Sequence, residues 1–157
     1  MGADPAAALC TYKASSKLET GLASKLTYPN TPHHGPYATD EPQSMPGGQN
    51  TGPNPMDLVL GALTTCQDIS YKAYATALGI DLQKVETAAE GDLDLRGFLG
   101  VDESVRKGFQ VIRGTVTLTT NADEATIAKL KGAVDAHCPM CATISEKIPI
   151  SLKVVKA

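Results

Sequence analysis

Cysteine is the residue type in this sequence with the widest chemistry, and the chain has four of them. Cys10 lies near the start and Cys66 in mid-chain, whereas Cys138 and Cys141 lie close together near the end. A cysteine thiolate is a nucleophile and a ligand for soft metal ions. The spacing is unlike the disulfide framework of a small secreted domain. In a reducing compartment these residues are expected to be buried thiols, redox thiols or metal ligands.

Cys138 has the most favourable local surroundings of the four. Pro139 follows it, and proline is typical of the first position of a helix. Cys138 is therefore predicted to be the N-cap, where free amides and the helix dipole stabilise a thiolate. Cys138 and Cys141 also form a C-x-x-C motif, but the strand that precedes such a redox motif in thioredoxin-like proteins is replaced here by a predicted helix. His137 could act as a base or be an ordinary polar residue, and both readings stay open.

Cys66 is predicted to lie in the middle of an apolar helix. A free cysteine there most often behaves as a small buried hydrophobe. Together with His137, Cys138 and Cys141 it has the ligand types of a tetrahedral zinc site. One C-x-x-C is a weak zinc signal, however, and the adjacent His137 and Cys138 would coordinate one ion with difficulty. We expect no structural zinc, and we keep a zinc or redox-sensing protein as a third alternative.

The clearest predicted element is a long helix that carries Cys66. Asn54 is a good N-cap, Asp57 follows three residues later, and Gly79 is a natural stop signal. Between them, apolar residues occur nearly all round the helix, and the charged residues are few. A helix of this kind is expected to be surrounded by protein on most of its sides.

In the rest of the chain, helices and strands are not predicted to alternate regularly. Strands are expected on either side of this helix, and a broken helix is expected near the end. One or two strands are expected within 9–28 with a turn near Gly21, followed by a loop rich in proline and glycine. The elements expected after the central helix are strands at 85–96 and 108–120, a helix from about 121 that Pro139 interrupts, a helical stretch to 147, and a strand at 150–155. The pattern indicates an α+β fold in one domain, 1–157, made of N-terminal strands (1–28), the loop (29–54) and a helix-sheet core (55–157).

Composition excludes several classes of function. The net charge is −3, 42% of the residues are hydrophobic, and no run of lysine or arginine occurs, which argues against a nucleic-acid partner. No apolar stretch is long enough to cross a membrane, and the first ten residues lack the features of a secretory signal. A cytoplasmic protein is therefore expected.

Two motifs carry a resemblance to a known family. The segment GGQNTGPNPMDLVLGALTTCQDI, in which Cys66 follows Pro55 by eleven residues, resembles the entry to the central helix of the OsmC/Ohr family. The later segments GDLDLRGFLG, GFQVIRGTVTL and HCPMC look like the family's later strands and its His-Cys-Pro motif. The resemblance covers the chain from about Gly47 onward, and it is the combination of Cys66 with His137-Cys138-Pro139 that makes it specific.

The resemblance implies a fold and a function. The fold would be an intertwined homodimer in which a long central helix packs on antiparallel sheet. The function would be a thiol-dependent peroxidase for organic hydroperoxides, with Cys66 as the attacking cysteine. Cys138 would close a disulfide with the resulting sulfenic acid, and a dithiol reductant would reopen it.

The sequence also departs from the family at two positions. Family peroxidases set an arginine from the N-terminal region, paired with a glutamate at the helix start, against the reactive cysteine. Here no arginine precedes Arg96, and Met56 stands in the place of the glutamate. These departures favour the alternative, a non-catalytic OsmC-like protein that binds a small ligand or senses redox state.

Overall fold

The computed structural model describes residues 8–31 and 34–156, and these fall into two compact units, Met1–Leu58 and Val59–Ala157. The expectation of a single domain over 1–157 stays a prediction.

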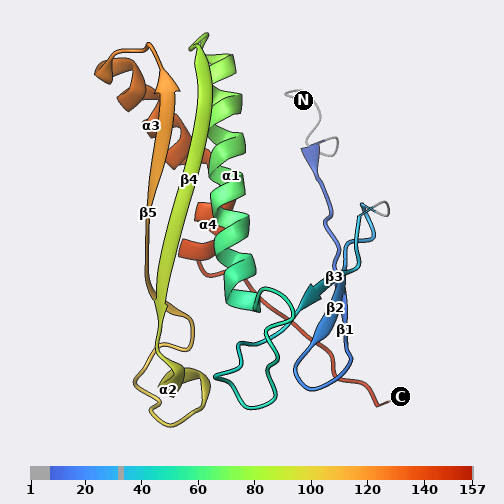
Figure 1. Ribbon diagram of the computed structural model, residues 1–157. Coiled ribbons are helices and arrows are strands. Elements are labelled where there is room, and N and C mark those ends of the chain that lie inside the picture. The colour runs from blue at the N-terminus through green and yellow to red at the C-terminus, as the bar shows by residue number, and fades with distance from the viewer. Residues whose placement is uncertain (1–7, 32–33, 157) are drawn as a thin grey trace. The chain divides into compact units, whose positions relative to one another are not determined.

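The first unit contains a three-stranded antiparallel sheet (Figure 1). Its strands are β1 (Ser15–Leu18), β2 (Ser24–Thr27) and β3 (Tyr37–Thr39), in the order β1-β2-β3. Gly21 turns the chain between β1 and β2 with a φ of 62°, which a residue without Cβ adopts at low cost. The two predicted strands and their turn are confirmed. The predicted loop at 29–54 needs a correction, because β3 lies within it and pairs with β2.

Asp40 orders the remainder of that loop. Its carboxylate is almost fully buried and accepts hydrogen bonds from the backbone N–H groups of Glu41, Gln49 and Thr51 and from the Thr51 hydroxyl. Burial alone would raise the pKa of Asp40, but these hydrogen bonds outweigh it and hold the pKa below its usual value. One side chain thus fixes a segment whose composition indicated only a loop.

Helix α1 (Pro55–Ala77) begins and ends where the sequence predicts. The Asp57 N–H donates to the Asn54 side chain at 2.8 Å, and the Asn54 N–H donates to the Asp57 carboxylate at 3.0 Å. This reciprocal pair is a capping box, which satisfies two amides that a helix start leaves without partners. At the other end, Gly79 has a φ of 68°, the left-handed conformation that commonly follows a helix.

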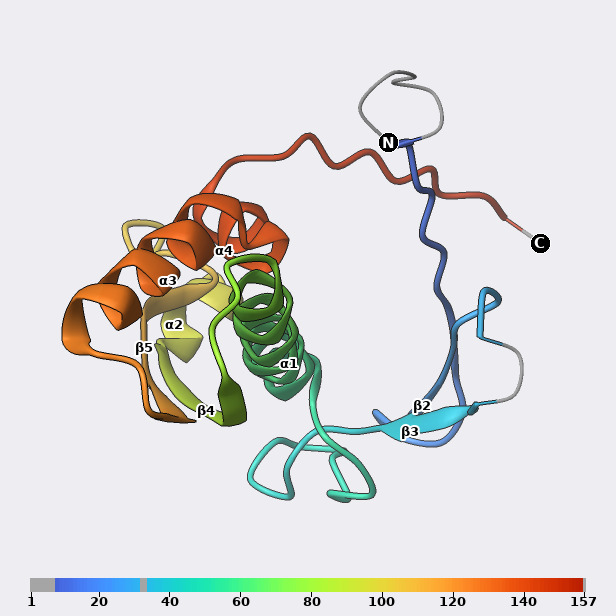
Figure 2. The same cartoon turned by 90° about the horizontal axis from the view of Figure 1, so that it is seen from above.

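The second unit is built on a long antiparallel hairpin of β4 (Leu82–Leu93) and β5 (Phe109–Thr120). A short helix, α2 (Leu95–Phe98), lies in the connection. Helices α3 (Glu124–His137) and α4 (Pro139–Ser145) follow, and they lie on the same side of the hairpin as α1 (Figures 1 and 2). Antiparallel sheets with helices on one face confirm the predicted α+β class.

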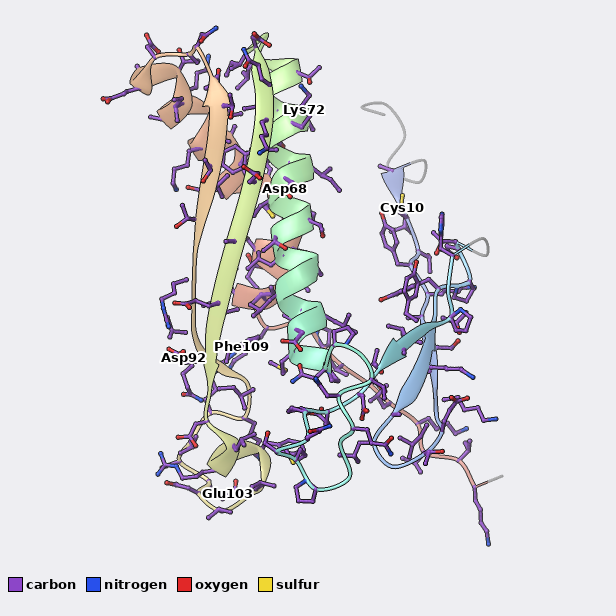
Figure 3. The ribbon with its side chains drawn as sticks, viewed as in Figure 1. Cys10, Asp68, Lys72, Asp92, Glu103 and Phe109 are labelled. Carbon is purple, nitrogen blue, oxygen red and sulfur yellow. The ribbon has the colours of Figure 1, made fainter. Side chains whose placement is uncertain are left out.

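The core of this unit lies between the hairpin and the three helices. Its buried apolar side chains are Tyr71, Ala75, Leu82, Leu130, Val134 and Cys138. Two polar contacts also join α1 to β4, because the Thr87 hydroxyl donates to Asp68 at 2.7 Å and the Lys72 ammonium donates to the Leu82 carbonyl at 2.8 Å. Asp68 and Lys72 both lie along α1 beside β4 (Figure 3).

One expectation differs from the structure. The segment predicted as a final strand, 150–155, has no helix or strand, and its apolar side chains are exposed, with Val154 at 96%. A strand needs a neighbour for its backbone hydrogen bonds, and none of the strands in the described part of the chain pairs with this segment. Ile69 on α1 is 70% exposed within one chain, so the expectation that protein covers α1 on most of its sides stays a prediction. The hairpin, α3 and α4 lie on the side of α1 that carries Tyr71 and Ala75, and Ile69 lies on another.

Candidate functional site

The second unit brings Cys66 and Cys138 together. Cys66 lies near the middle of α1 and Cys138 lies between α3 and α4, and their sulfur atoms are 3.7 Å apart. Both thiols are free. Cys138 is 2% exposed and belongs to the core, whereas Cys66 is partly exposed beside it. The two residues that the sequence analysis singled out therefore form one thiol pair.

Pro139 explains why Cys138 reaches this position. Proline disfavours the helical conformation for the residue before it, and Cys138 accordingly has extended backbone angles, φ −68° and ψ 114°. The chain turns there, so that Cys138 ends α3 and begins α4. The predicted N-cap position is confirmed. Its side chain makes no capping hydrogen bond, but the amides of Met140 and Cys141 lie near enough to affect its ionisation.

Cys141 is a third thiol of the same cluster. It lies on the first turn of α4, near enough to Cys138 for each thiol to affect the pKa of the other. The buried side chain of Gln67, next to Cys66 on α1, donates from its amide nitrogen to the Cys141 sulfur at 3.1 Å. Sequence reasoning missed Gln67. The available signal was its position, since it lies one helical turn before Tyr71 on the face of α1 that is buried.

The three thiols differ in acidity. Burial raises the pKa of the Cys66 thiol, and the proton shared with Cys138 raises it further, against lowering by the Met140 amide and the Ser70 hydroxyl. For Cys138, burial alone would raise the pKa, but the Cys141 amide, the two neighbouring thiols and the Met140 amide outweigh it and lower the pKa.

The pKa of Cys141 is raised, like that of Cys66. Burial and the neighbouring Cys138 together raise the pKa of Cys141 to about 11, although Gln67 acts in the opposite direction. The reduced cluster thus carries its first negative charge on Cys138.

His137 is adjacent to the cluster in sequence, but its ring is engaged elsewhere. Its Nδ1 lies 2.8 Å from the carbonyl oxygen of Ala133 one turn earlier in α3, and the ring lies against Tyr74 with centroids 5.6 Å apart. These contacts favour the reading of His137 as a polar helix residue. Cys10 is exposed and belongs to the first unit.

Two further observations bear on the class of site. Over residues 8–31 and 34–156, no three histidine, cysteine or acidic side chains are grouped closely enough to hold a metal ion. None of the helices in that part of the chain combines the length and the apolar character that a membrane crossing requires.

Fold and site together define a class: an α+β protein in which a long helix and a helix break set two thiols face to face against an antiparallel hairpin. The chain belongs to the OsmC-like protein family, whose profile matches residues 48–153. The family resemblance is thereby confirmed. A search of curated protein sequences finds no significant match.

Solved structures of other family members share this fold. An OsmC-like protein of Mycoplasma pneumoniae aligns with a TM-score of 0.72 at 16% identity, over 86% of this chain and 87% of the other. An organic hydroperoxide resistance protein of Legionella pneumophila aligns with a TM-score of 0.65 at 18% identity, over 87% and 90%. Another, from Elizabethkingia anophelis, aligns with a TM-score of 0.64 at 17% identity, over 87% and 90%.

Proposed function

We propose that this protein is a thiol-dependent peroxidase that reduces organic hydroperoxides through Cys66 and Cys138 and so contributes to defence against oxidative stress. The observation that carries the proposal is the 3.7 Å separation of the two sulfur atoms. A small movement would bring them to the ~2.05 Å of a disulfide bond. Family membership supports it, as do two of the similar structures, which are organic hydroperoxide resistance proteins.

Cys66 is the attacking residue in this mechanism, and Cys138 handles its proton. The Cys138 thiolate, whose sulfur lies 3.7 Å from that of Cys66, accepts the proton of Cys66. The Cys66 thiolate attacks the distal oxygen of the hydroperoxide, the O–O bond breaks, and Cys138 returns the proton to the departing alkoxide. A thiolate of higher pKa is intrinsically the stronger nucleophile, which suits Cys66 to the attack.

Cys138 then acts a second time. Having given up its proton it is again a thiolate, and it attacks the sulfenic sulfur of Cys66. A Cys66–Cys138 disulfide forms and hydroxide leaves. An external dithiol reduces this disulfide and restores both thiols, so that no metal or organic cofactor takes part.

The surroundings of Cys66 favour an organic substrate over hydrogen peroxide. Ala62 and Leu63 lie within one turn of Cys66 on α1, and they offer apolar surface to the alkyl group of a substrate. The four free thiols suit a reducing compartment, and we assign the reaction to the cytoplasm.

We also propose that the protein acts as a homodimer. Ile69 on α1 is 70% exposed, and the apolar segment that includes Ile150, Leu152 and Val154 is exposed without a strand partner in the described chain. Apolar surface of this extent commonly marks a protein interface. A second copy of the chain would cover both.

The rival proposal is a non-catalytic protein that binds a small ligand beside the thiols or senses redox state. One observation favours it: within the described residues, no basic side chain is among the groups that shift the pKa of Cys66. Met56, in the place of the family's glutamate, is consistent with it.

Stopped-flow mixing of the reduced protein with cumene hydroperoxide distinguishes the two proposals. A peroxidase consumes hydroperoxide stoichiometrically without added reductant and turns over when a dithiol is supplied. Cys138→Ser should accumulate a sulfenic acid on Cys66 that dimedone traps, whereas Cys66→Ser should form none quickly. Cys10→Ser is the matched control and should react like the unmodified chain.

Two results would reject the proposal in different ways. Hydroperoxide loss no faster than from free cysteine would leave the ligand-binding or redox-sensing rival. Rapid dimedone labelling of Cys138 in Cys66→Ser would keep the peroxidase but reverse the two roles.

A further inference from the structure

The thiol cluster has one member that the mechanism above leaves without a role. Cys138 contacts Cys66, at 3.7 Å between sulfur atoms, and it also lies near Cys141, whose thiol and amide affect its pKa. Cys138 is therefore in reach of two possible disulfide partners. Cys141 could be an inert core thiol, but the following contacts argue against that reading.

We propose that Cys141 is a third redox cysteine, which takes the disulfide over from Cys66 and presents it to the reductant as a Cys138–Cys141 bond. This inference rests on the proposed peroxidase cycle, which supplies the Cys66–Cys138 disulfide.

The exchange is a balanced thiol–disulfide reaction. The Cys141 thiolate attacks the Cys138 sulfur, the S–S bond to Cys66 breaks, and its electron pair remains on Cys66. The proton that Cys141 loses is taken up by Cys66, whose raised pKa makes it a thiol again. No net oxidation occurs, so the step needs no further reagent.

The position of Cys141 suits this attack. It follows Cys138 by three residues at the start of α4, and residues three apart on a helix have Cβ atoms only ~5–6 Å apart. Side chains at this spacing meet without movement of the backbone, and the effect of each thiol on the pKa of the other agrees with their proximity.

The negative charge of the cluster determines that the Cys66–Cys138 disulfide forms before Cys141 attacks it. In the reduced cluster Cys141 stays protonated, because burial and the neighbouring Cys138 raise its pKa to about 11. Formation of the Cys66–Cys138 disulfide removes the negative charge of Cys138. The pKa of Cys141 then falls, so that Cys141 becomes a nucleophile only after the disulfide that it attacks has formed.

Gln67 is a positioning residue for this step. Its amide nitrogen donates to the Cys141 sulfur at 3.1 Å, a contact that favours the thiolate. Gln67 is 9% exposed, and this sulfur is the hydrogen-bond acceptor that the structure gives to its amide nitrogen. A buried amide aimed at a cysteine is hard to explain if the cysteine is only a filler of the core.

The solvent exposure of the three cysteines indicates what the disulfide exchange would achieve. The Cys138 sulfur is in the core, at 2% exposure for the residue, and a reductant cannot approach it directly. Cys66 is partly exposed, as is Cys141. Transfer of the disulfide frees Cys66 for the next hydroperoxide while the reductant attacks at Cys141.

The test counts hydroperoxide equivalents and locates the disulfide, in a Cys10→Ser background and without reductant. The chain with Cys141 should consume two equivalents of cumene hydroperoxide, and Cys141→Ser or Cys141→Ala should consume one. After one equivalent of hydroperoxide and acid quenching, mass spectrometry should find the Cys138–Cys141 disulfide in the chain that keeps Cys141. In Cys141→Ser and Cys141→Ala it should find the Cys66–Cys138 disulfide.

Each result decides the matter. One equivalent and a lasting Cys66–Cys138 disulfide in the chain with Cys141 would overturn the third-cysteine proposal and leave the peroxidase intact. Two equivalents consumed by both Cys141 variants would overturn it as well. No consumption by any of them would overturn the peroxidase, and the third-cysteine proposal with it.

Gln67→Met tests the positioning role, because methionine keeps the length of the side chain and removes its N–H donor. The exchange should shift to higher pH, since the group that lowers the pKa of Cys141 is gone. An unchanged pH profile of the exchange would assign Gln67 a structural role only.

Discussion

At the scale of residues, the chemistry of the site depends on three thiols that compete for one negative charge. A thiolate on Cys138 is stabilised by the amides of Met140 and Cys141 and by the Cys66 thiol 3.7 Å away. The same contact makes a second ionisation at Cys66 unfavourable, because two like charges would face each other in a partly buried site. Acidity is therefore a property of the cluster, and removal of one thiol changes the others.

The first prediction follows from this coupling. Cys66→Ala removes a donor that lowers the pKa of Cys138, so the Cys138 thiolate should form at higher pH than in the unmodified chain. The measurement is a pH titration of 13Cβ-labelled cysteine by NMR. Cys10→Ala is the control, and its Cys138 midpoint should stay in place. A midpoint that moves downward in Cys66→Ala would show that the two thiols do not share a proton.

At the scale of elements, short-range contacts determine where the central helix begins and how the loop before it is held. The capping box of Asn54 and Asp57 sets the start of α1. The Asp40 carboxylate holds the loop by accepting four hydrogen bonds, which come from Glu41, Gln49 and Thr51. Both devices satisfy backbone amides that would otherwise be left without partners.

The second prediction concerns the capping box. Asn54→Ala should lower the free energy of unfolding by about 1 kcal/mol, the usual effect of losing an N-cap side chain. Urea unfolding followed by circular dichroism measures it. Asn121→Ala is a suitable control, because the Asn121 side chain makes no hydrogen bond within the described residues and should change stability little. Equal stability of the two variants would mean that the cap contributes nothing.

The third prediction concerns Asp40. Its pKa in the folded protein lies below the unfolded value of about 3.8. Its contribution is therefore fully present above pH ~4 and is lost as the pH falls through the folded pKa. Asp40→Asn replaces an acceptor oxygen with an amide that faces the N–H groups of Gln49 and Thr51.

Amide hydrogen exchange at neutral pH should detect the loss of the hydrogen bonds to Asp40 in Asp40→Asn. The amides of Gln49 and Thr51 should exchange faster in Asp40→Asn than in the unmodified chain. Glu41→Gln serves as the control and should leave these amides protected. Unchanged protection in Asp40→Asn would show that the loop is held by other contacts.

At the scale of the whole molecule, the chain exposes apolar side chains that have no role in the proposed reaction. One face of α1 presents Ile69, and the segment at 147–156 presents a row of aliphatic side chains. Water contact with such surface is unfavourable, and its burial against a second copy would stabilise a dimer.

The fourth prediction tests this dimer at α1. Ile69→Lys places a charge on the face proposed to be covered, and sedimentation velocity should show a shift from dimer toward monomer at micromolar concentration. Val101→Lys changes an equally exposed apolar residue on the connection after α2, 72% against 70% exposed, and should leave the dimer intact. A monomer in the unmodified chain would refute the dimer outright.

The sequence by itself determined the features that depend on neighbouring residues. Asn54 and Asp57 start α1, Gly79 ends it, and Pro139 breaks the helix at Cys138. These signals act over three or four residues, through hydrogen bonds and steric limits on the backbone, and can therefore be read without the fold. The two motifs that carry the family resemblance are likewise local.

Only the tertiary structure decided what happens between segments far apart in the chain. Cys66 and Cys138 are 72 positions apart, and it is the packing of α1 against α3 and α4 that sets their sulfur atoms 3.7 Å from each other. The donor to Cys141 comes from Gln67, on another helix. The order of the pKa values follows from these contacts and from burial, which no local pattern reports. The predicted strand at 150–155 was wrong for the same reason, because a strand exists only where a neighbour accepts and donates its hydrogen bonds.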